Sequence, residues 1–388
     1  MSPRAADVVV IGAGVMGASI AWQLSRRKAG RVLVLDKGDV ASGGSGRSSA
    51  LVRMHYSHAP EVALAKLSYE MFVAWPEMLG LPGHFKKTGF IRLVPEPEIE
   101  RLRKNVEMHR GFGIDARVLS RQELQEVAPA WDFSDVSAGA YEPDSGYGDG
   151  AGVAGDFLLR AREAGVEYRS GTKAESLKVE AGRVCGVVVP DGVVEAAQVV
   201  VATGPWCRAL VAAVGFDPPV ESEFHEVALL KNPPGLESIG PAGIDSPTET
   251  YFRSEAGGLT LIGDFYGKRG IDPDVIGIGA SQEGMLRLVE RSSRRIPALA
   301  EAGLFRGVAG CYDMSPDARP LMGPVPGVEG LHLVAGFSGT GFKISPAVGV
   351  VIAELLTGAR TSVDITSFRP SRFLEGQPIR APHEYASD

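Results

Sequence analysis

The chain has 388 residues, of which 44% are hydrophobic and 22% are charged, and its formal net charge is −7. This is the composition of a globular protein, and the length predicts two domains, because single cores stop growing near about 250–300 residues. The negative charge argues against nucleic-acid binding, and no apolar run reaches the ~20 residues that a membrane-spanning helix needs. The cysteines, Cys185, Cys207 and Cys311, lie far apart and predict neither a disulfide framework nor a metal-binding pair. We therefore expect a cytoplasmic protein.

The N-terminal segment has the pattern of a strand, a helix and a second strand. An apolar run at 7–11 predicts a buried strand, 18–27 predicts a helix, and a second apolar run at 31–36 ends in Asp36. Between the first strand and the helix, three glycines follow the G-x-G-x-x-G spacing: Gly12, Gly14 and Gly17. This combination is the fingerprint of dinucleotide binding.

Each part of this motif has a physical role. The first glycine permits the turn, the second lets the backbone approach a pyrophosphate, and the third allows the helix to pack closely on the strand. The helix N-terminus at Val15 and Met16 offers unpaired N–H groups to a phosphate. Asp36 is expected to accept hydrogen bonds from a ribose diol, and its charge disfavours the extra phosphate of NADP.

A segment rich in glycine and serine, 41–49, directly follows the second strand. Its N–H and hydroxyl groups and its arginine suit phosphate and ring oxygens. We expect cofactor contacts at this end of the sheet from Lys37, Ser45, Gly46, Arg47 and Ser48. The alternative interpretation of the same composition is a flexible surface loop.

The rest of the chain contains further predicted helices and strands. Apolar spacing predicts helices at 61–80, 95–109, 152–164, 281–295 and 345–356, and strands at 90–94, 166–168, 184–189, 198–202, 251–253, 259–262 and 331–335. Two of these strands run into glycine-containing turns, at Thr203, Gly204 and Trp206 and at 336–343. Both turns are expected to approach the cofactor. No pair of histidines has the spacing of metal ligands, so we expect no metal.

Together these blocks resemble the D-amino acid oxidase superfamily, in its sarcosine oxidase and glycine oxidase branch. The resemblance rests on the N-terminal glycine motif, Ser45-Gly-Arg-Ser-Ser49, Ala202-Thr-Gly-Pro-Trp206, Met314-Ser-Pro-Asp317 and Gly336-Phe-Ser-Gly-Thr-Gly-Phe-Lys343. It covers essentially the whole chain and implies FAD and an α/β fold. In that fold an FAD-binding Rossmann-like domain of the glutathione reductase type (1–85, 141–220 and 306–388) is interleaved with a substrate domain of antiparallel sheet and helices (86–140 and 221–305).

The family likeness also implies a reaction. The enzyme would oxidise the C–N bond of a small amino acid or secondary amine, such as glycine, sarcosine or a bulkier N-alkyl glycine. A hydride passes to flavin N5, the imine hydrolyses, and O₂ is reduced to H₂O₂. An FAD amine dehydrogenase that uses another electron acceptor is the alternative. An NAD-dependent dehydrogenase would account for 7–36 but not for the C-terminal glycine block.

Residues can be carried over from the family one by one. Arg53 and Lys343 match the arginine and lysine that hold a substrate carboxylate, Tyr251 matches a tyrosine of the substrate pocket, and His55 lies where it could accept the amine proton. A buried core tyrosine is the alternative for Tyr251. The resemblance adds further expected cofactor contacts: Ala174, Gly310, Gly339, Thr340, Gly341, Phe342 and Lys343.

The sequence departs from the family pattern at three positions. Gly310 stands where relatives bond a cysteine to flavin, and Cys311 is the next residue. Because adjacent strand residues point to opposite faces, we predict non-covalent FAD. Leu261 replaces a lysine that promotes reaction with O₂, with Lys268 as the nearest candidate substitute, and Phe265 replaces a histidine. The change at Phe265 predicts an altered substrate pocket, whereas the change at Leu261 means that reaction with O₂ is expected from the family and not from this residue.

Overall fold

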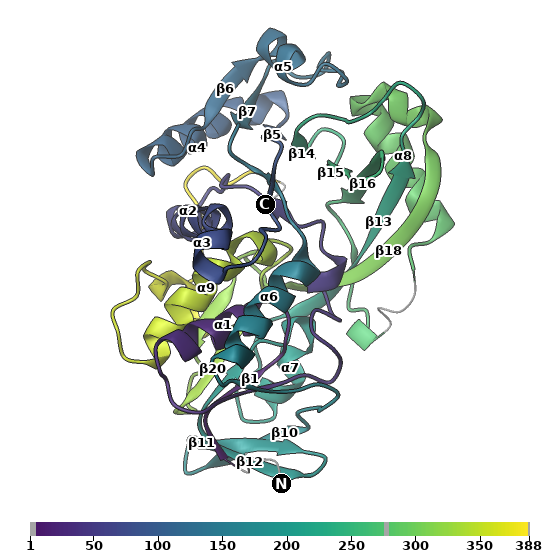
Figure 1. Cartoon of the computed structure of the whole chain (residues 1–388). Coiled ribbons are helices and arrows are strands. Elements are labelled where there is room, and N and C mark those ends of the chain that lie inside the picture. The colour runs from purple at the N-terminus through teal and green to yellow at the C-terminus, as the bar shows by residue number, and fades with distance from the viewer. Residues whose placement is uncertain (1–4, 275–278, 387–388) are drawn as a thin grey trace.

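The computed structural model describes residues 5–274 and 279–386, and within these ranges the strands form two large sheets and one small one (Figure 1). The first large sheet has eight strands. Its parallel strands are β1 (Ala5–Ile11), β2 (Val32–Leu35), β9 (Glu167–Arg169), β12 (Gly192–Val201) and β20 (Leu331–Ala335), and its antiparallel ones are β10 (Ser176–Glu180), β11 (Arg183–Val189) and β19 (Leu321–Pro324). Apolar strands buried on both faces are typical of parallel sheets, and every residue of β2 is buried.

Five helices belong to this part of the molecule: α1 (Val15–Arg26), α2 (Ala59–Val73), α3 (Trp75–Leu79), α6 (Gly150–Glu163) and α9 (Gly341–Leu356). Helix α1 packs against both α6 and α9. The contact with α9 is close, since a Cβ atom on Gly349 would lie 2.1 Å from the Ser19 hydroxyl oxygen. The short helix α7 (Cys207–Ala212) follows β12.

Helix α9 begins earlier than the sequence predicted. It starts at Gly341 rather than Ser345, so residues expected in a glycine loop form its first turn. Pro346 is tolerated inside the helix because the Ser345 hydroxyl donates to the carbonyl oxygen of Phe342 (2.8 Å), which Pro346 has no N–H group to serve. The predicted helix at 61–80 is likewise two helices, which meet at Ala74 before Pro76.

The second large sheet has nine strands. Its order is β17-β13-β16-β15-β14-β5-β7-β6, with β18 on β13, and all its pairs are antiparallel except β14 with β5. The strands are β5 (Phe90–Leu93), β6 (Arg117–Ser120), β7 (Ala138–Glu142), β13 (Glu221–Lys231), β14 (Ala242–Asp245), β15 (Thr250–Glu255), β16 (Leu259–Asp264), β17 (Lys268–Arg269) and β18 (Gly303–Met314). Strand β18 crosses the predicted domain boundary at 305.

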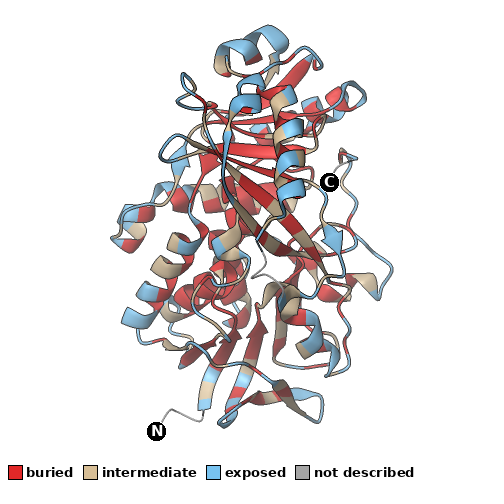
Figure 2. Cartoon of the chain, turned by 90° about the vertical axis from the view of Figure 1, so that its right-hand side faces the viewer, coloured by how far each residue is buried: buried red, intermediate tan, exposed pale blue. Residues whose placement is uncertain are grey.

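The two faces of this sheet have different partners. One face packs with α5 (Arg121–Val127) and α8 (Gln282–Arg295) in a hydrophobic cluster, and α8 exposes its outer side to solvent (Figure 2). The other face carries Phe90, Val227, Tyr251 and Leu261, which pack with residues of the small sheet. That sheet consists of β3 (Leu51–Val52), β4 (Lys86–Lys87) and β8 (Gly146–Tyr147). It therefore covers part of this face, and its strand β3 also contacts α9.

Helix α4 (Ile99–Gly111) packs in the same hydrophobic cluster as α1, α2, α6 and α9. The described residues also form short 3-10 helices at 45–47, 96–98, 204–206, 297–301, 366–368 and 370–373. Over the described residues, every helix is too short or too polar to cross a membrane. The predicted fold class is confirmed, because a Rossmann-like sheet is interleaved along the chain with a largely antiparallel one.

Candidate functional site

Two glycines of the N-terminal motif, Gly12 and Gly17, lie where a side chain would overlap the backbone. Gly12 has a φ of +108°, and a Cβ atom there would lie 2.4 Å from the carbonyl oxygen of Ala202. A Cβ on Gly17 would lie 1.8 Å from the carbonyl oxygen of Gly12. Gly14 is the N-cap of α1. The turn therefore brings the start of α1 against the ends of β1 and β12, with bare backbone at the surface of the turn.

The start of α1 is suited to an anion. Its N-cap has no side chain that caps the helix, and its first turn contains no acidic residue. The Val15 N–H group donates to the Ser45 hydroxyl (3.0 Å), which brings the glycine- and serine-rich loop over the helix end. The N–H groups of Met16 and Gly17 are also in this first turn. This arrangement fits a pyrophosphate.

Asp36 directly follows β2, beside the same turn. Its Oδ2 atom accepts a hydrogen bond from the Ala13 N–H group (2.7 Å), and Oδ1 accepts one from the Gly38 N–H group (2.8 Å). Each carboxylate oxygen has two lone pairs, so both can still accept a ribose hydroxyl. The geometry fits the role predicted for this residue.

The remaining predicted cofactor contacts surround these two features. Thr203 has a buried hydroxyl oxygen without a hydrogen-bond partner among the described residues, and Gly204 follows with a φ of +54°. The Lys37 ammonium lies over the Trp206 ring, 4.1 Å from the ring centroid, and the Trp206 indole N–H group donates to the Asp274 carboxylate (2.9 Å). Lys37 also forms an ion pair with Asp274. Ala174 is buried against the first sheet.

The Ser-rich loop meets the second sheet at Arg47. The Arg47 guanidinium donates to the carbonyl oxygens of Ser42 and Gly43, and a Cβ atom on Gly310 would lie 3.3 Å from Arg47 Cβ. The Gly46 N–H group donates a hydrogen bond to the Ala41 carbonyl oxygen (3.0 Å). The Ser48 hydroxyl accepts the Ala50 N–H (3.0 Å).

The C-terminal glycine block reaches the same place from the other end of the chain. A Cβ atom on Gly341 would lie 3.1 Å from the Met16 side chain, so the starts of α1 and α9 are neighbours. Gly339 has a φ of +78°, and the Tyr312 ring lies against it. The Thr340 carbonyl oxygen accepts a hydrogen bond from the Tyr56 hydroxyl (3.4 Å). Phe342 is buried. The structure therefore gathers the first and last motifs around one region.

Arg53 and Lys343 both lie close to the aromatic ring of Tyr56. The Tyr56 ring centroid is 4.5 Å from the Arg53 guanidinium carbon and 6.0 Å from the Lys343 ammonium nitrogen. Arg53 donates to the His55 carbonyl, and its buried Nε atom has no partner among the described residues. Burial and then the charge of Arg53 hold the pKa of Lys343 well below its usual value, with Glu61 opposing the shift. Two neighbouring cations, of which Arg53 is half-buried and Lys343 is buried, attract an anion.

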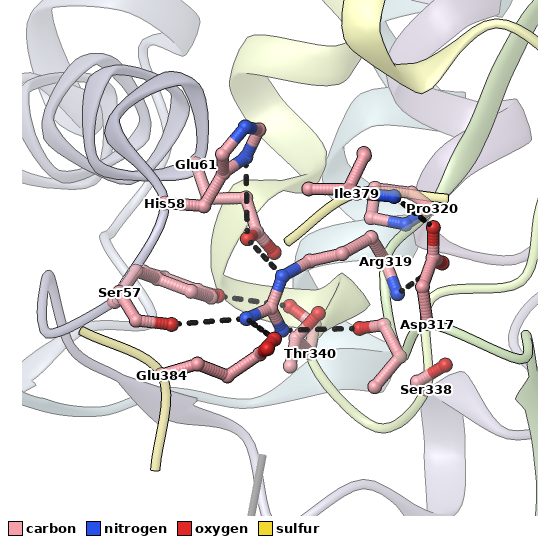
Figure 3. Close-up of polar contacts among 12 residues, drawn as sticks. Ser57, His58, Glu61, Asp317, Arg319, Pro320, Ser338, Thr340, Ile379 and Glu384 are labelled. Atoms are coloured by element: carbon pink, nitrogen blue, oxygen red, sulfur yellow. Dashed lines mark hydrogen bonds and ion pairs between the residues drawn. The ribbon is translucent and has the colours of Figure 1, made fainter. Parts of the chain in front are cut away.

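A second arginine, Arg319, was missed by the sequence analysis. Figure 3 shows its guanidinium among Ser57, Glu61 and Glu384, with contacts of 2.9 Å to the Ser57 hydroxyl and 3.0 Å to each carboxylate. Two acids neutralise this cation. Glu61 forms its ion pair with Arg319, although its charge also reaches Lys343. Because neither Arg53 nor Lys343 has an ion pair among the described residues, their pair is the more electropositive of the two places.

His55 and Tyr251 do not share one cluster. His55 Nε2 lies 2.8 Å from the Tyr385 hydroxyl, and burial and then His109 lower the pKa of its imidazole well below the usual value. The Tyr251 hydroxyl lies 3.1 Å from that of Tyr312, which the sequence analysis also missed. The Tyr312 ring stacks on His225 at 4.0 Å. The side-chain pair Tyr251–Tyr312 could not be found by spacing, because the residues are 61 positions apart.

The three departures from the family pattern can be located. In the register of β13 and β18, Gly310 pairs with His225 and Cys311 with Phe224, so Cys311 points to the face opposite that of Gly310. Leu261 is buried in the apolar face of β16, and Lys268 is exposed on β17. Phe265 lies with its ring 5.8 Å from the Arg92 guanidinium carbon.

Comparison with known proteins decides the family. Residues 7–355 match the DAO family, described as FAD dependent oxidoreductase. The chain belongs to the DAO family. Its cofactor is therefore FAD, and the predicted resemblance to the sarcosine oxidase and glycine oxidase branch is confirmed.

Individual relatives are similar at low identity. Dimethylglycine dehydrogenase of Rattus norvegicus is 25% identical over 391 residues, which cover 95% of this chain but 45% of the relative, so the chain spans less than half of that protein. Glycine oxidase of Geobacillus kaustophilus is 26% identical and covers 95% of this chain and 97% of its own length. The solved structure of L-proline dehydrogenase from P. horikoshii has a TM-score of 0.90 at 27% identity, covering 97% of this chain and 100% of that one.

Proposed function

We propose that this protein oxidises the C–N bond of a small amino acid or secondary amine that carries a carboxylate. The observation that carries the proposal is the Arg53–Lys343 pair beside the start of α9, in which Arg53 is half-buried and Lys343 is buried, and which forms no ion pair with an acid among the described residues. Similar proteins include glycine oxidase, dimethylglycine dehydrogenase and L-proline dehydrogenase, which all act on amino acids. A secondary amino acid such as sarcosine, proline or an N-alkyl glycine is the substrate class that we favour.

Each residue has a part in this chemistry. FAD, when bound, supplies the acceptor for the hydride. Arg53 and Lys343 hold the carboxylate from two sides and so fix the orientation of the α-carbon. Tyr251, Tyr312 and the apolar residues around Leu261 form a wall that excludes water from the reacting carbon. The imine product then hydrolyses in water.

The electron acceptor has two candidates. We propose O₂, as in the glycine oxidase relative. The buried Leu261 and the exposed Lys268 favour the second candidate, a dehydrogenase, because no lysine ammonium projects from the apolar face of β16. Similar proteins carry both kinds of name.

The first test is anaerobic reduction of the purified yellow protein. Sarcosine, glycine, proline and N-alkyl glycines are added singly, and bleaching of the flavin band identifies the substrate class. Air is then admitted. Rapid return of the band with peroxide supports the oxidase, whereas a bleached flavin that is reoxidised only by an artificial dye supports the dehydrogenase. A flavin that none of these compounds bleaches would overturn the proposed substrate class.

The carboxylate pair has its own test, Lys343→Met. Loss of one charged hydrogen bond costs about 1.5–3 kcal/mol, so we expect KM to rise by roughly 10- to 100-fold while flavin stays bound. A lysine is cationic only below its pKa, and that of Lys343 is lowered. In the wild type, affinity for the carboxylate should therefore fall as pH rises through this lowered pKa, and the variant should lack that change. Lys66→Met, on the surface of α2, is the control, and an equal KM in both variants would contradict the pair.

A further inference from the structure

Three metal-ligand side chains meet in the interior beside the Arg53 segment. His55 follows β3, His109 lies in α4, and Glu142 ends β7. Their exposed fractions are 2%, 0% and 0%. One ligand atom from each lies within 4.8 Å of the other two, and the His55 and His109 ring centroids are 4.6 Å apart. The positions 55, 109 and 142 follow no sequence motif, so the sequence analysis expected no metal.

One nitrogen or oxygen atom of each side chain, called its inner atom below, lacks a hydrogen-bond partner. These atoms are His55 Nδ1, His109 Nδ1 and Glu142 Oε1, and all three are buried in the described structure without a donor or acceptor. The nearest approach between His55 and Glu142 is 4.0 Å from Nδ1 to Oε1, which is too long for a hydrogen bond. A buried polar atom without a partner destabilises the fold, so three together favour a site that binds a ligand.

The outer atoms of the same side chains are held in place. His109 Nε2 donates to the Tyr56 carbonyl oxygen (2.8 Å), which leaves a lone pair on its Nδ1 atom. His55 Nε2 is bonded to the Tyr385 hydroxyl (2.8 Å). Glu142 Oε2 accepts from the Met54 N–H (2.9 Å) and the Ser145 hydroxyl (2.6 Å). Metal-binding histidines and carboxylates in proteins are oriented by such outer hydrogen bonds.

We propose that His55, His109 and Glu142 bind a divalent transition-metal ion of the Zn²⁺ class. Two imidazoles and one carboxylate are a donor set that zinc accepts, and a fourth position stays open. Ligands about 2.0–2.2 Å from a tetrahedral zinc are about 3.4 Å apart, so the inner atoms need to move closer by roughly 1 Å.

Charges around the cluster set the expected affinity. Glu142 supplies one negative charge to the site. Arg53 and Arg92 lie close enough to disfavour a proton on His55, and they repel a metal ion in the same way. The site should therefore bind zinc more weakly than a closed four-ligand zinc site.

A metal here would act on Arg53 through the backbone. The Arg53 guanidinium donates to the carbonyl oxygen of His55, and the Met54 N–H group donates to Glu142. Zinc would thus fix the segment 53–55 from two sides, making the three ligands positioning residues for the carboxylate pair. This consequence rests on the proposed function, whereas metal binding itself does not.

The test measures metal content in the FAD-loaded protein without an affinity tag. The protein is freed of metal with a chelator, dialysed against Zn²⁺ at a small excess, gel-filtered and analysed by atomic emission. We expect about one zinc per chain, a higher Tm with zinc, and visible d–d absorption of tetrahedral type when Co²⁺ replaces it. Absence of retained zinc in the folded wild type would overturn the proposal.

Variants separate this site from adventitious binding. His109→Ala removes a ligand and should abolish retention, and Glu142→Gln, which keeps the shape of the side chain, should weaken it at least tenfold. The control is His332→Ala in β20, because His332 Nδ1 is also buried without a partner but lies outside the cluster. Equal zinc in all variants would contradict the assignment. Flavin bleaching by substrate is measured on the same samples, so failure of the proposed function is seen separately.

Discussion

At the scale of single residues, the glycine turn gives the sharpest prediction. Gly12→Ala places a Cβ atom 2.4 Å from the Ala202 carbonyl and forces alanine to a φ of +108°. The backbone conformation alone costs about 1–2 kcal/mol, and the overlap adds to it. We expect the variant to purify with little or no FAD and to unfold at lower urea concentration.

Gly155→Ala is the matched control for this prediction. Gly155 lies inside α6, and a Cβ atom there meets no other atom within 4 Å. Alanine stabilises a helix interior by about 0.5–1 kcal/mol relative to glycine, so this variant should keep its flavin and resist urea slightly better. Full flavin occupancy in Gly12→Ala would contradict the role given to the turn.

The residue scale also separates what a sequence can predict from what it cannot. The glycine motif and Asp36 could be located because strand, turn, helix and acid are consecutive in the first 36 residues. Arg319 could not, since its partners Ser57 and Glu384 are 262 and 65 positions away. Glu384 approaches it only because the C-terminal segment folds back over the chain. The catalytic and cofactor roles of the individual residues remain predictions.

At the scale of elements, a buried ion pair ties the C-terminal segment to the core. Arg372, in the 3-10 helix 370–373, forms a two-pronged contact with Asp317 (2.8 and 2.9 Å), and both side chains are almost fully buried. Asp317→Asn leaves the arginine buried without a counter-charge. Breaking such a pair costs about 3–5 kcal/mol, so the free energy of unfolding should fall by that amount in urea titrations.

The exposed pair Arg208–Asp217 is the control for this prediction. Its side chains are 50% and 56% exposed, although the contacts, 2.6 and 2.7 Å, are as short as those of the buried pair. Exposed pairs contribute about 0–1 kcal/mol, so Asp217→Asn should change stability little. Similar losses in both variants would show that burial does not decide the strength of the Asp317 contact.

The boundaries of an element could be predicted where a single sequence pattern, such as an apolar run, acts alone. The prediction failed where two patterns give opposite indications. Strands such as β2 and β20 were found because their apolar runs are bounded by polar or turn residues. The start of α9 was misplaced because its glycines suggested a loop, whereas Gly341 lies in the first turn of the helix, where a Cβ atom would be 3.1 Å from both Met16 and Phe337. The short strand β14 was missed because it is defined by pairing with β5, about 150 residues earlier.

At the scale of the whole molecule, the chain passes repeatedly from one large sheet to the other. The glycine turns of the first sheet and the apolar face of the second sheet meet near the starts of α1 and α9. Strand β18 belongs to the second sheet, and its Gly310 lies against Arg47 of the Ser-rich loop. Cys311 points to the opposite face of β18 and is buried there. FAD held in this region should therefore have no covalent bond to the chain.

This arrangement predicts the effect of removing the cofactor. Acid precipitation should release all the flavin into the supernatant, and Cys311→Ser should behave in the same way. Colour retained in the wild-type precipitate alone would contradict the non-covalent site.

Removal of FAD should also lower the thermal stability. Because FAD binds the assembled turns of the folded chain, the apoprotein should have a lower Tm than the FAD-loaded protein. Adding FAD at about 100 times its Kd restores about 2.7 kcal/mol by mass action, which is several degrees for a chain of this size. An unchanged Tm would mean that the FAD-binding region contributes nothing to the cooperative unfolding of the protein.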